Sequence, residues 1–383
     1  MPPALVPMAI AGGGIGGLAL AVALTQRGFP VRVFEQAPHL DPVGAGLNIW
    51  QNAAHVLREL GVLDGLAARG TRYRHLDLLR PDGRLLRRGA MPQGDPPGLF
   101  VRRADLQAAL EDALPADVLV TGRAVAGFDD DGRGVTVRFD DGATFEASVL
   151  VGADGARSRV RAALLGHRDP ALVYRGYVAW QGVVHGVPEG YGAGRLSETW
   201  GPGARFALFP AGADALYWYA TVSQPETAPE APAGRRAELA APFGTWHAPR
   251  PDVIGRIDEA AVYRTPIHDL PPLRTWTRGR VALLGDAAHA MTPNVGQGAC
   301  QALEDALVLA RRLAEAPDVP AAFRAYARAR RARTAFVQRE ARLVGWVGQW
   351  RHPHALRVRD TLLRTLPQAI TERTVRRLAA YRA

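Results

Sequence analysis

A glycine pattern near the start of the chain places the narrowest limit on how this sequence can fold. The apolar run 9–11 leads into Gly12-Gly13-Gly14-Ile15-Gly16-Gly17, followed by an apolar helical stretch and a second apolar run ending at Glu35. Such glycines allow a tight turn and bring a pyrophosphate close to a helix N-terminus, while an acid about 20 residues on suits a ribose hydroxyl rather than a 2′-phosphate. We therefore predict a Rossmann-like dinucleotide-binding unit, with contacts from Gly12, Gly14, Ile15, Gly17 and Glu35.

A second glycine-rich turn follows the apolar run 281–284. It reads Gly285-Asp286-Ala287-Ala288-His289-Ala290-Met291-Thr292-Pro293-Asn294-Val295-Gly296-Gln297-Gly298 and precedes a helical stretch at 299–307. The pattern predicts a strand that ends at an acid, next to a loop and the N-terminus of a helix. The carboxylate can accept hydrogen bonds from sugar-like hydroxyls, and the helix dipole favours a developing anion. A reduced flavin offers both groups.

A third strand-to-turn segment lies between these two motifs. Residues 149–161 read Val-Leu-Val-Gly-Ala-Asp-Gly-Ala-Arg-Ser-Arg-Val-Arg, with Asp154 at an Asp-Gly turn. Together the three segments resemble the flavoprotein aromatic hydroxylases related to p-hydroxybenzoate hydroxylase, and the resemblance covers nearly the whole chain. Within that group the sequence looks most like the salicylate, 3-hydroxybenzoate and urate hydroxylases.

The resemblance implies a cofactor role for particular residues. The first motif would hold the ADP part of FAD, and the Asp154 motif would serve FAD and the passing nicotinamide cofactor. Further contacts would come from the loop 44–48 with Gly46, from Arg103, from Asp286 on the ribityl hydroxyls, and from the Pro293, Gly296 and Gly298 loop at the flavin ring. One departure is Ala290, where a proline is common in the family.

The activity implied by the resemblance is that of an FAD-dependent monooxygenase. It would use NADPH or NADH and O2 to hydroxylate an aromatic or heteroaromatic small molecule through a flavin C4a-hydroperoxide, without a metal. Only one Gly-x-Gly-x-x-Gly unit is present, which fits a reductant that docks briefly. The sequence contains no lysine, which excludes the flavin halogenases. Epoxidation or Baeyer-Villiger chemistry on a non-aromatic substrate, and a flavin-binding protein without oxygenase activity, remain alternatives.

Composition narrows the partners and the compartment. Cys300 is the single cysteine, which excludes an intramolecular disulfide, favours the cytoplasm and is typical of a packed side chain. The net charge of +10 is concentrated in residues 321–383, where 15 arginines face three acids. That tail is read as a solvated helical face or as a contact for an acidic membrane or partner. No basic and aromatic module indicates nucleic acid, no run indicates an integral membrane segment, and a homodimer stays open.

The order of motifs predicts a discontinuous α/β protein. A Rossmann-like FAD-binding domain is expected from 1–74, 101–171 and 275–345, and it is interrupted by a β-rich substrate domain at 75–100 and 172–274. A hairpin is predicted around Asp141-Gly142. Residues after 320 read as helices, with 346–383 forming a C-terminal helical tail.

The β-rich insertion is expected to cover the flavin and to select the substrate. On the predicted strand 216–222, Tyr217 shares one face with Tyr219 and Thr221, and Arg205 lies on the partner strand. We predict that Arg205 and Tyr217 position the substrate, with an Arg205 that points to solvent as the alternative. The pair resembles the bacterial FAD-dependent urate hydroxylases, but Asn294 stands where those enzymes have an acid, which makes urate a poor fit.

Other groups near the flavin are assigned by their chemistry. The candidate bases for a phenol are Tyr217, His289 or a substrate-relayed group, with His289 more typical of a structural residue. Aromatic side chains are expected to keep water from the reacting centre, or to be core packing: Trp180, Trp200, Phe209 and Trp218.

Overall fold

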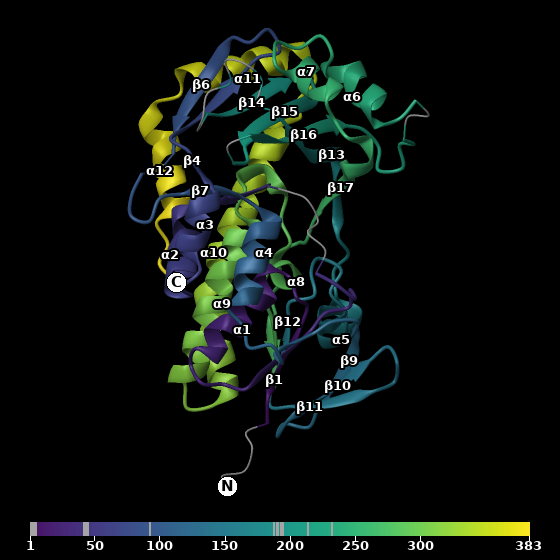
Figure 1. The fold of residues 1–383 in the computed structure, drawn as a ribbon, viewed down its shortest axis with the longest axis vertical. Coiled ribbons are helices and arrows are strands. Elements are labelled where there is room, and N and C mark those ends of the chain that lie inside the picture. The colour runs from purple at the N-terminus through teal and green to yellow at the C-terminus, as the bar shows by residue number, and fades with distance from the viewer. Residues whose placement is uncertain are drawn as a thin grey trace.

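The computed structural model places a Rossmann-like unit beneath a broad, mostly antiparallel sheet (Figure 1). The description covers residues 6–40, 46–91, 93–186, 188, 191, 195–212, 214–230 and 233–383. Within these ranges, no helix combines the length and apolar character needed to span a bilayer.

The lower unit is built on a six-stranded sheet whose strands come from distant parts of the chain. Its order is β18 (Thr277–Arg278), β19 (Val281–Leu283), β12 (Leu150–Gly152), β1 (Met8–Ala11), β2 (Val31–Phe34) and β8 (Leu119–Val120). All neighbours are parallel except the β18–β19 pair. The three predicted motifs follow β1, β12 and β19, which are neighbours in the sheet, so their turns meet at one edge.

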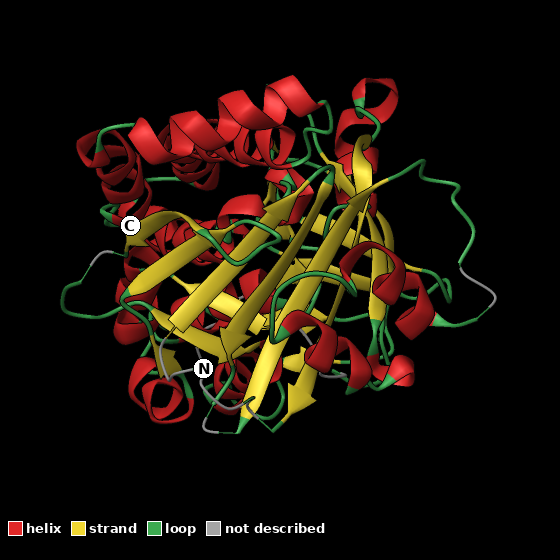
Figure 2. Ribbon diagram, turned by 90° about the horizontal axis from the view of Figure 1, so that it is seen from above, coloured by secondary structure: helices red, strands yellow, loops and turns green. Residues whose placement is uncertain are grey.

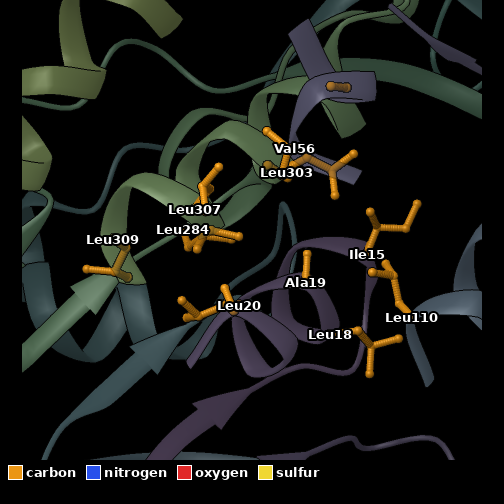
Figure 3. Close-up of a cluster of buried hydrophobic side chains, with 14 of the residues drawn as sticks. Ile15, Leu18, Ala19, Leu20, Val56, Leu110, Leu284, Leu303, Leu307 and Leu309 are labelled. Carbon is orange, nitrogen blue, oxygen red and sulfur yellow. The ribbon is translucent and has the colours of Figure 1, made fainter. Parts of the chain in front are cut away.

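Helices complete the core of this unit. Helix α1 (Ile15–Thr25) is apolar almost all round and is buried accordingly. It packs against α4 (Arg103–Asp112) and α9 (Gly298–Glu315), and Figure 3 shows Leu18 beside Leu110 of α4, with Leu20 on the side of Leu307 of α9. The remaining helices nearby are α2 (Gln51–Glu59), α3 (Leu63–Arg69), α5 (Arg159–Leu165) and α8 (Asp286–His289), with the 3₁₀ turns η1 (Gly166–Arg168) and η3 (Pro293–Val295).

Two small antiparallel sheets flank the unit. One consists of β9 (Val125–Asp130), β10 (Val135–Phe139) and β11 (Thr144–Ala147), and it contains the hairpin predicted at Asp141-Gly142, where Gly142 has a φ of +80°. The other consists of β3 (Gly46–Ile49), β7 (Leu99–Arg102) and β4 (Thr71–Arg72). Strand β3 carries the described part of the predicted flavin loop, and Gly44 and Ala45 lie outside the described residues.

The upper layer is a seven-stranded sheet, seen from above in Figure 2. Its order is β17 (Tyr263–Asp269), β13 (Val173–His185), β16 (Ala215–Ser223), β15 (Ala204–Pro210), β14 (Arg195–Gly201), β5 (His75–Leu79) and β6 (Leu85–Ala90). The predicted strand 216–222 and its partner strand with Arg205 are confirmed as β16 and β15. Helices α6 (Arg235–Phe243) and α7 (Arg250–Gly255) cover the outer face, and η2 (Glu259–Ala261) leads into β17.

The predicted C-terminal helices are confirmed as α10 (Val319–Gly348), α11 (Pro353–Thr365) and α12 (Gln368–Ala379). The last two pack on β6, and α12 also touches α2. The expectation of a solvated arginine face is wrong for part of residues 321–383. Four arginines of this segment bond carboxylates or carbonyl groups in or near the interior: Arg330, Arg333, Arg342 and Arg359.

Candidate functional site

The glycines after β1 have different tasks. A Cβ on Gly12 would lie 2.4 Å from the carbonyl oxygen of Ala153, and one on Gly17 would lie 2.0 Å from the carbonyl oxygen of Gly12. These two positions hold the β1 turn against the β12 turn and against its own helix. A Cβ on Gly14 would meet nothing within 4 Å. Gly14 is therefore the glycine of the motif that borders open space.

Helix α1 begins beside this open space with free backbone amides. Gly14 is its N-cap and provides no side-chain hydrogen bond, while Ile15 is buried beneath the turn. Half-buried Glu35, at the end of β2, accepts hydrogen bonds from the amides of Gly13 at 2.7 Å and Ala37 at 2.9 Å. Each carboxylate oxygen keeps a lone pair, so Glu35 is fixed in place and can still accept a bond from a hydroxyl.

Asp154 holds together the turn that follows β12. Its carboxylate accepts hydrogen bonds from the Ser158 hydroxyl at 2.5 Å, the Arg159 amide at 2.8 Å and the Val160 amide at 3.1 Å. These are the first groups of α5, so the carboxylate satisfies the free amides of a helix start. Arg161 then bonds the carbonyl oxygen of Ala287 at 3.3 Å, which ties this motif to α8.

Asp286 is the first residue of α8, after Gly285 with a φ of +62°. Its side chain is exposed to solvent, yet the surrounding protein desolvates the carboxyl group and raises its pKa, while His289 and Arg103 act in the opposite direction. A carboxylate that is accessible and still desolvated sits in a recessed position. Arg103 begins α4, so the structure brings two of the predicted cofactor residues together from distant segments.

The loop from Pro293 to Gly298 lies beside β3. Gly296 has a left-handed conformation with a φ of +60°, and a Cβ there would lie 3.2 Å from Asn48 Nδ2. Gly298 opens α9, whose N-terminus has no side-chain cap. The predicted loops at Gly46 and Gly296 thus meet next to a free helix N-terminus. Cys300 donates its thiol to the Asn48 carbonyl oxygen at 3.3 Å, and burial raises its pKa to about 12, as expected of a packed thiol.

A buried ionic cluster supports the Asp286 turn. His289 Nε2 lies 2.5 Å from Asp305 Oδ2, and Asp305 accepts a 2.6 Å bond from Arg330. Arg330 also pairs with Glu304, and all four side chains are at most 1% exposed. His289 is held inside this cluster, so it is a structural residue and not a base for the substrate.

Tyr217 directly contacts the predicted flavin loop. A Cβ on Gly46 would lie 2.8 Å from Tyr217 Cγ and 2.0 Å from Phe100 Cζ. Phe209 stacks on Tyr217 with ring centroids 6.0 Å apart. The three rings form one apolar wall where β15 and β16 reach β3 and β7. The Tyr217 hydroxyl donates to Gln181 Oε1 at 2.8 Å, and burial raises the pKa of Tyr217.

Arg205 lies on the same face of the sheet as Tyr217 but in a different environment. It is 1% exposed, so the solvent-facing alternative is wrong. Its guanidinium bonds Asn294 Oδ1 and approaches Glu198 Oε1 to 3.3 Å, without the geometry of a hydrogen bond. Burial works against its charge, but Glu198 and the nearby tyrosines raise the pKa of Arg205 above the ordinary value.

Two side chains lie between Tyr217 and Arg205 to which the sequence analysis assigned no role. Tyr219 pairs with Ala207 across β15 and with Gln181 across β13, and Tyr219 and Gln181 are both partly exposed. Burial and the neighbouring Glu198 raise the pKa of Tyr219 well above its ordinary value, so its phenol stays protonated. The alternation along β16 pointed to Tyr219, whereas no sequence signal singled out Gln181.

The predicted aromatic wall is only half right. Phe209 faces the flavin loop, and Trp200 packs over Arg205 at 5.9 Å. Trp180 and Trp218 point to the other face of the sheet, where they pack in the second hydrophobic core beneath α6 and α7. Strand alternation puts odd-numbered residues of β16 on one face and Trp218 on the other, so neither tryptophan can shield the flavin.

Comparison with known proteins agrees with this geometry. The chain matches the FAD binding domain family over residues 6–190 and 199–341. Aurachin C monooxygenase/isomerase of Stigmatella aurantiaca is 42% identical over 374 residues, which cover 96% of each protein. An FAD-dependent urate hydroxylase of Klebsiella pneumoniae is 36% identical over 323 residues, or 83% of this chain and 84% of the hydroxylase.

A solved structure gives the same fold. Klebsiella pneumoniae HpxO, complexed with FAD and uric acid, superposes with a TM-score of 0.89 at 30% sequence identity, covering 98% of this chain and 96% of that one. The relatives fit the predicted oxygenase and do not fit a flavin-binding protein without activity. The chain therefore belongs to the FAD binding domain family and is an FAD-dependent monooxygenase of the aromatic hydroxylase group.

Proposed function

We propose that the chain oxygenates an aromatic or heteroaromatic small molecule held between the flavin and the inner face of the large sheet. One observation carries this proposal: the Gly46 backbone, in the predicted flavin loop, touches Tyr217 and Phe100. A ring bound beside Tyr217 is therefore next to the flavin. Bound FAD, reduced by a nicotinamide cofactor, supplies the oxygen-transfer chemistry, and the protein supplies placement and polarity.

The cofactor would be held by the residues that the three motifs bring together. The open space at Gly14 and the free amides of α1 suit the pyrophosphate, and Glu35 suits the ribose. Recessed Asp286 suits the ribityl hydroxyls, and the uncapped start of α9 suits the ring edge that becomes anionic on reduction. Asp154 would support the cofactor site without contacting FAD, because its carboxylate already accepts hydrogen bonds from the first residues of α5.

The division of labour would follow the predicted domains. Residues 1–74, 101–171 and 275–345 would bind FAD, 75–100 and 172–274 would select the substrate, and 346–383 would form a supporting tail. The membership of β5 and β6 in the large sheet supports this division. A reducing compartment, the cytoplasm, suits a chain whose single cysteine is buried and reduced.

The substrate would meet Tyr219 and Gln181 rather than the guanidinium of Arg205. Both side chains are partly exposed. Within the described ranges Gln181 bonds Tyr217 through its oxygen alone, so its amide is available to donate. Tyr217 and Tyr219 have raised pKa values and His289 is enclosed, so these groups act as donors or supports and not as bases. Arg205 is a positioning residue: it holds the Asn294 side chain in place and neutralises the charge of Glu198.

The substrate class follows from the same contacts and from the relatives. Asn294 accepts from Arg205 and donates to the Tyr177 hydroxyl at 2.9 Å and to the Ala341 carbonyl oxygen at 3.0 Å. Because the Asn294 amide already makes these three hydrogen bonds within the protein, it has little capacity left to bind a urate-like ligand. The aurachin C enzyme matches 96% of the chain at 42% identity. We therefore favour a heteroaromatic substrate of the aurachin kind over urate.

Anaerobic flavin reduction tests the proposed function. The rate with NADPH and with NADH is measured with and without phenolic and heteroaromatic compounds, aurachin C among them. One compound is expected to accelerate reduction by orders of magnitude and to leave the enzyme with one oxygen atom from ¹⁸O2 after air is admitted. Equal reduction rates with every compound, and no labelled product, would contradict a substrate-gated hydroxylase.

The Arg205→Gln variant is expected to keep its FAD and to bind the substrate more weakly. Without Arg205, the buried carboxylate of Glu198 is uncompensated beside Tyr219, which should disturb the placement of the Tyr219 hydroxyl. Loss of one hydrogen bond from Tyr219 to the substrate is worth about 0.5–1.5 kcal/mol, so the dissociation constant should rise roughly 2- to 13-fold. Product formed per NAD(P)H consumed should also fall.

A double variant separates positioning from folding. Combining Glu198→Gln with Arg205→Gln removes both charges, which should restore any lost stability but not product yield. The exposed Arg364→Gln variant is the matched control for the loss of one arginine. Unchanged affinity and unchanged product yield in Arg205→Gln would show that Arg205 has no part in positioning.

A further inference from the structure

A basic recess of about 570 Å³ opens on the outer face of the large sheet, away from the flavin motifs. It lies between the end of β13, the start of β14 and helix α7. The side chains that matter for its charge are three arginines, one acid, one histidine and one tyrosine: Arg195, Arg250, Arg256, Asp252, His247 and Tyr191. With His247 neutral, the recess carries an excess of positive charge.

Arg250 gives this recess its unusual character. The side chain is 1% exposed, and its Nη2 donates to Ser197 Oγ at 2.8 Å. Its Nε has no hydrogen-bond partner among the described residues, and no carboxylate of that part of the chain pairs with it. Burial lowers the pKa of Arg250 to about 10. A paired carboxylate would instead raise this pKa. A buried cation without an anion costs several kcal/mol, unlike the paired Arg330 and Arg205.

Among the residues that the structure describes, the neighbouring groups leave that charge uncompensated. His247 Nε2 lies 3.1 Å from Thr199 Oγ1, and burial together with Arg250 lowers the pKa of His247 to about 4. Arg195 is 3.3 Å from Asp77, and Arg256 bonds the Gly186 carbonyl oxygen at 3.1 Å. Asp252 is the only acid among the described residues that line the recess, and it is exposed at the rim.

Strand β14 separates the recess from the catalytic side. Its residues alternate, so Ser197 and Thr199 reach the recess through Arg250 and His247. Glu198 and Trp200 point the other way and contact Arg205. The sheet lies between the two regions, so a molecule in the recess cannot exchange a hydride or an oxygen atom with the flavin.

We propose that this recess is a second binding site, specific for a small molecule that carries a phosphate or carboxylate group. The oxyanion sits against Arg250, with Arg195 and Arg256 at the entrance. Planar guanidinium groups bind oxyanions with paired, charge-assisted hydrogen bonds, and Arg250 Nε is a donor without a partner. The ligand is an effector or a structural anion rather than the oxygenated substrate, because the sheet separates it from the flavin.

Titration of the holoenzyme with inorganic phosphate and, separately, acetate tests the site. Calorimetry at constant ionic strength is expected to show one saturable site per chain. Binding should weaken at least tenfold in Arg250→Gln and stay unchanged in Arg364→Gln, which removes the same charge from the exposed face of α11. Phosphate binding without acetate binding assigns a phosphate ligand, and acetate binding alone assigns a carboxylate.

His247 provides a readout that needs no variant. A bound anion offsets the field of Arg250, so the pKa of the imidazole should rise when the wild-type protein is saturated, as followed by NMR of the ring. This measurement decides the question if Arg250→Gln fails to fold. The proposal is overturned if neither anion binds saturably, if Arg250→Gln binds like the wild type, or if saturation leaves the His247 titration unchanged.

Discussion

Replacing Asp286 with alanine is expected to give a folded protein that purifies without FAD. The carboxylate is accessible, recessed and placed by the β19 turn near Arg103, so no neighbouring acid can replace it as an acceptor for the ribityl hydroxyls. Hydrogen bonds to a charged group are worth about 1.5–3 kcal/mol each, so FAD affinity should fall roughly 10- to 150-fold. The measurement is the FAD-to-protein absorbance ratio, followed by titration of the apoprotein with FAD.

Two further variants make this result specific. Asp286→Asn keeps the shape and one acceptor oxygen and should bind FAD with intermediate affinity. Glu315→Ala removes an exposed acid from the far end of α9 and should retain the cofactor fully. If Asp286→Ala retains its full complement of FAD and matches the wild type in the titration, the ribityl assignment is wrong.

The second large effect is expected in the buried ionic cluster. Replacing Arg330 with methionine leaves Glu304 and Asp305 without their common cation in the interior. Removing one partner from a buried ion pair costs about 3–5 kcal/mol. Urea denaturation with saturating FAD should show this loss in the free energy of unfolding, whereas Arg331→Met, on the exposed side of the same helix, should change it by less than about 0.5 kcal/mol.

The pH dependence distinguishes lost charge from poor packing. Burial alone would raise the pKa of Asp305, but His289 and Arg330 hold it below the ordinary value. The stabilisation is therefore complete near neutral pH and is lost as the pH falls through that lowered pKa. In Arg330→Met, Asp305 takes up its proton at higher pH, so the gap to the wild type should narrow on acidification. A gap that stays constant with pH would indicate a cavity instead.

The cofactor motifs were predictable because their chemistry is local. A glycine turn between a strand and a helix has one backbone geometry, and the acid at Glu35 follows at a spacing that the strand length sets. The structure adds a distinction that the pattern alone hides. Gly12 and Gly17 are needed for contacts within the protein, and Gly14 borders open space.

The substrate face was harder to predict because it depends on contacts between distant segments. Alternation along β16 showed that Tyr217 and Trp218 face opposite ways, but not which face covers the flavin. That choice is made by α6 and α7, which enclose Trp180 and Trp218 on the outer side. The burial of Arg205 likewise depends on Asn294, 89 residues away. An arginine on a strand carries no local sign of such a partner.

The distance along the chain between α1 and α9 has a consequence for biosynthesis. The apolar surface of α1 is covered by α9, and β1 pairs with β12, yet both partners leave the ribosome long after the first helix. Until residue 315 has emerged, the apolar helix α1 lacks the cover of α9 and can pack only against earlier elements such as α4. Incomplete chains are thus open to chaperones and proteases, and the cofactor can be captured only near the end of translation.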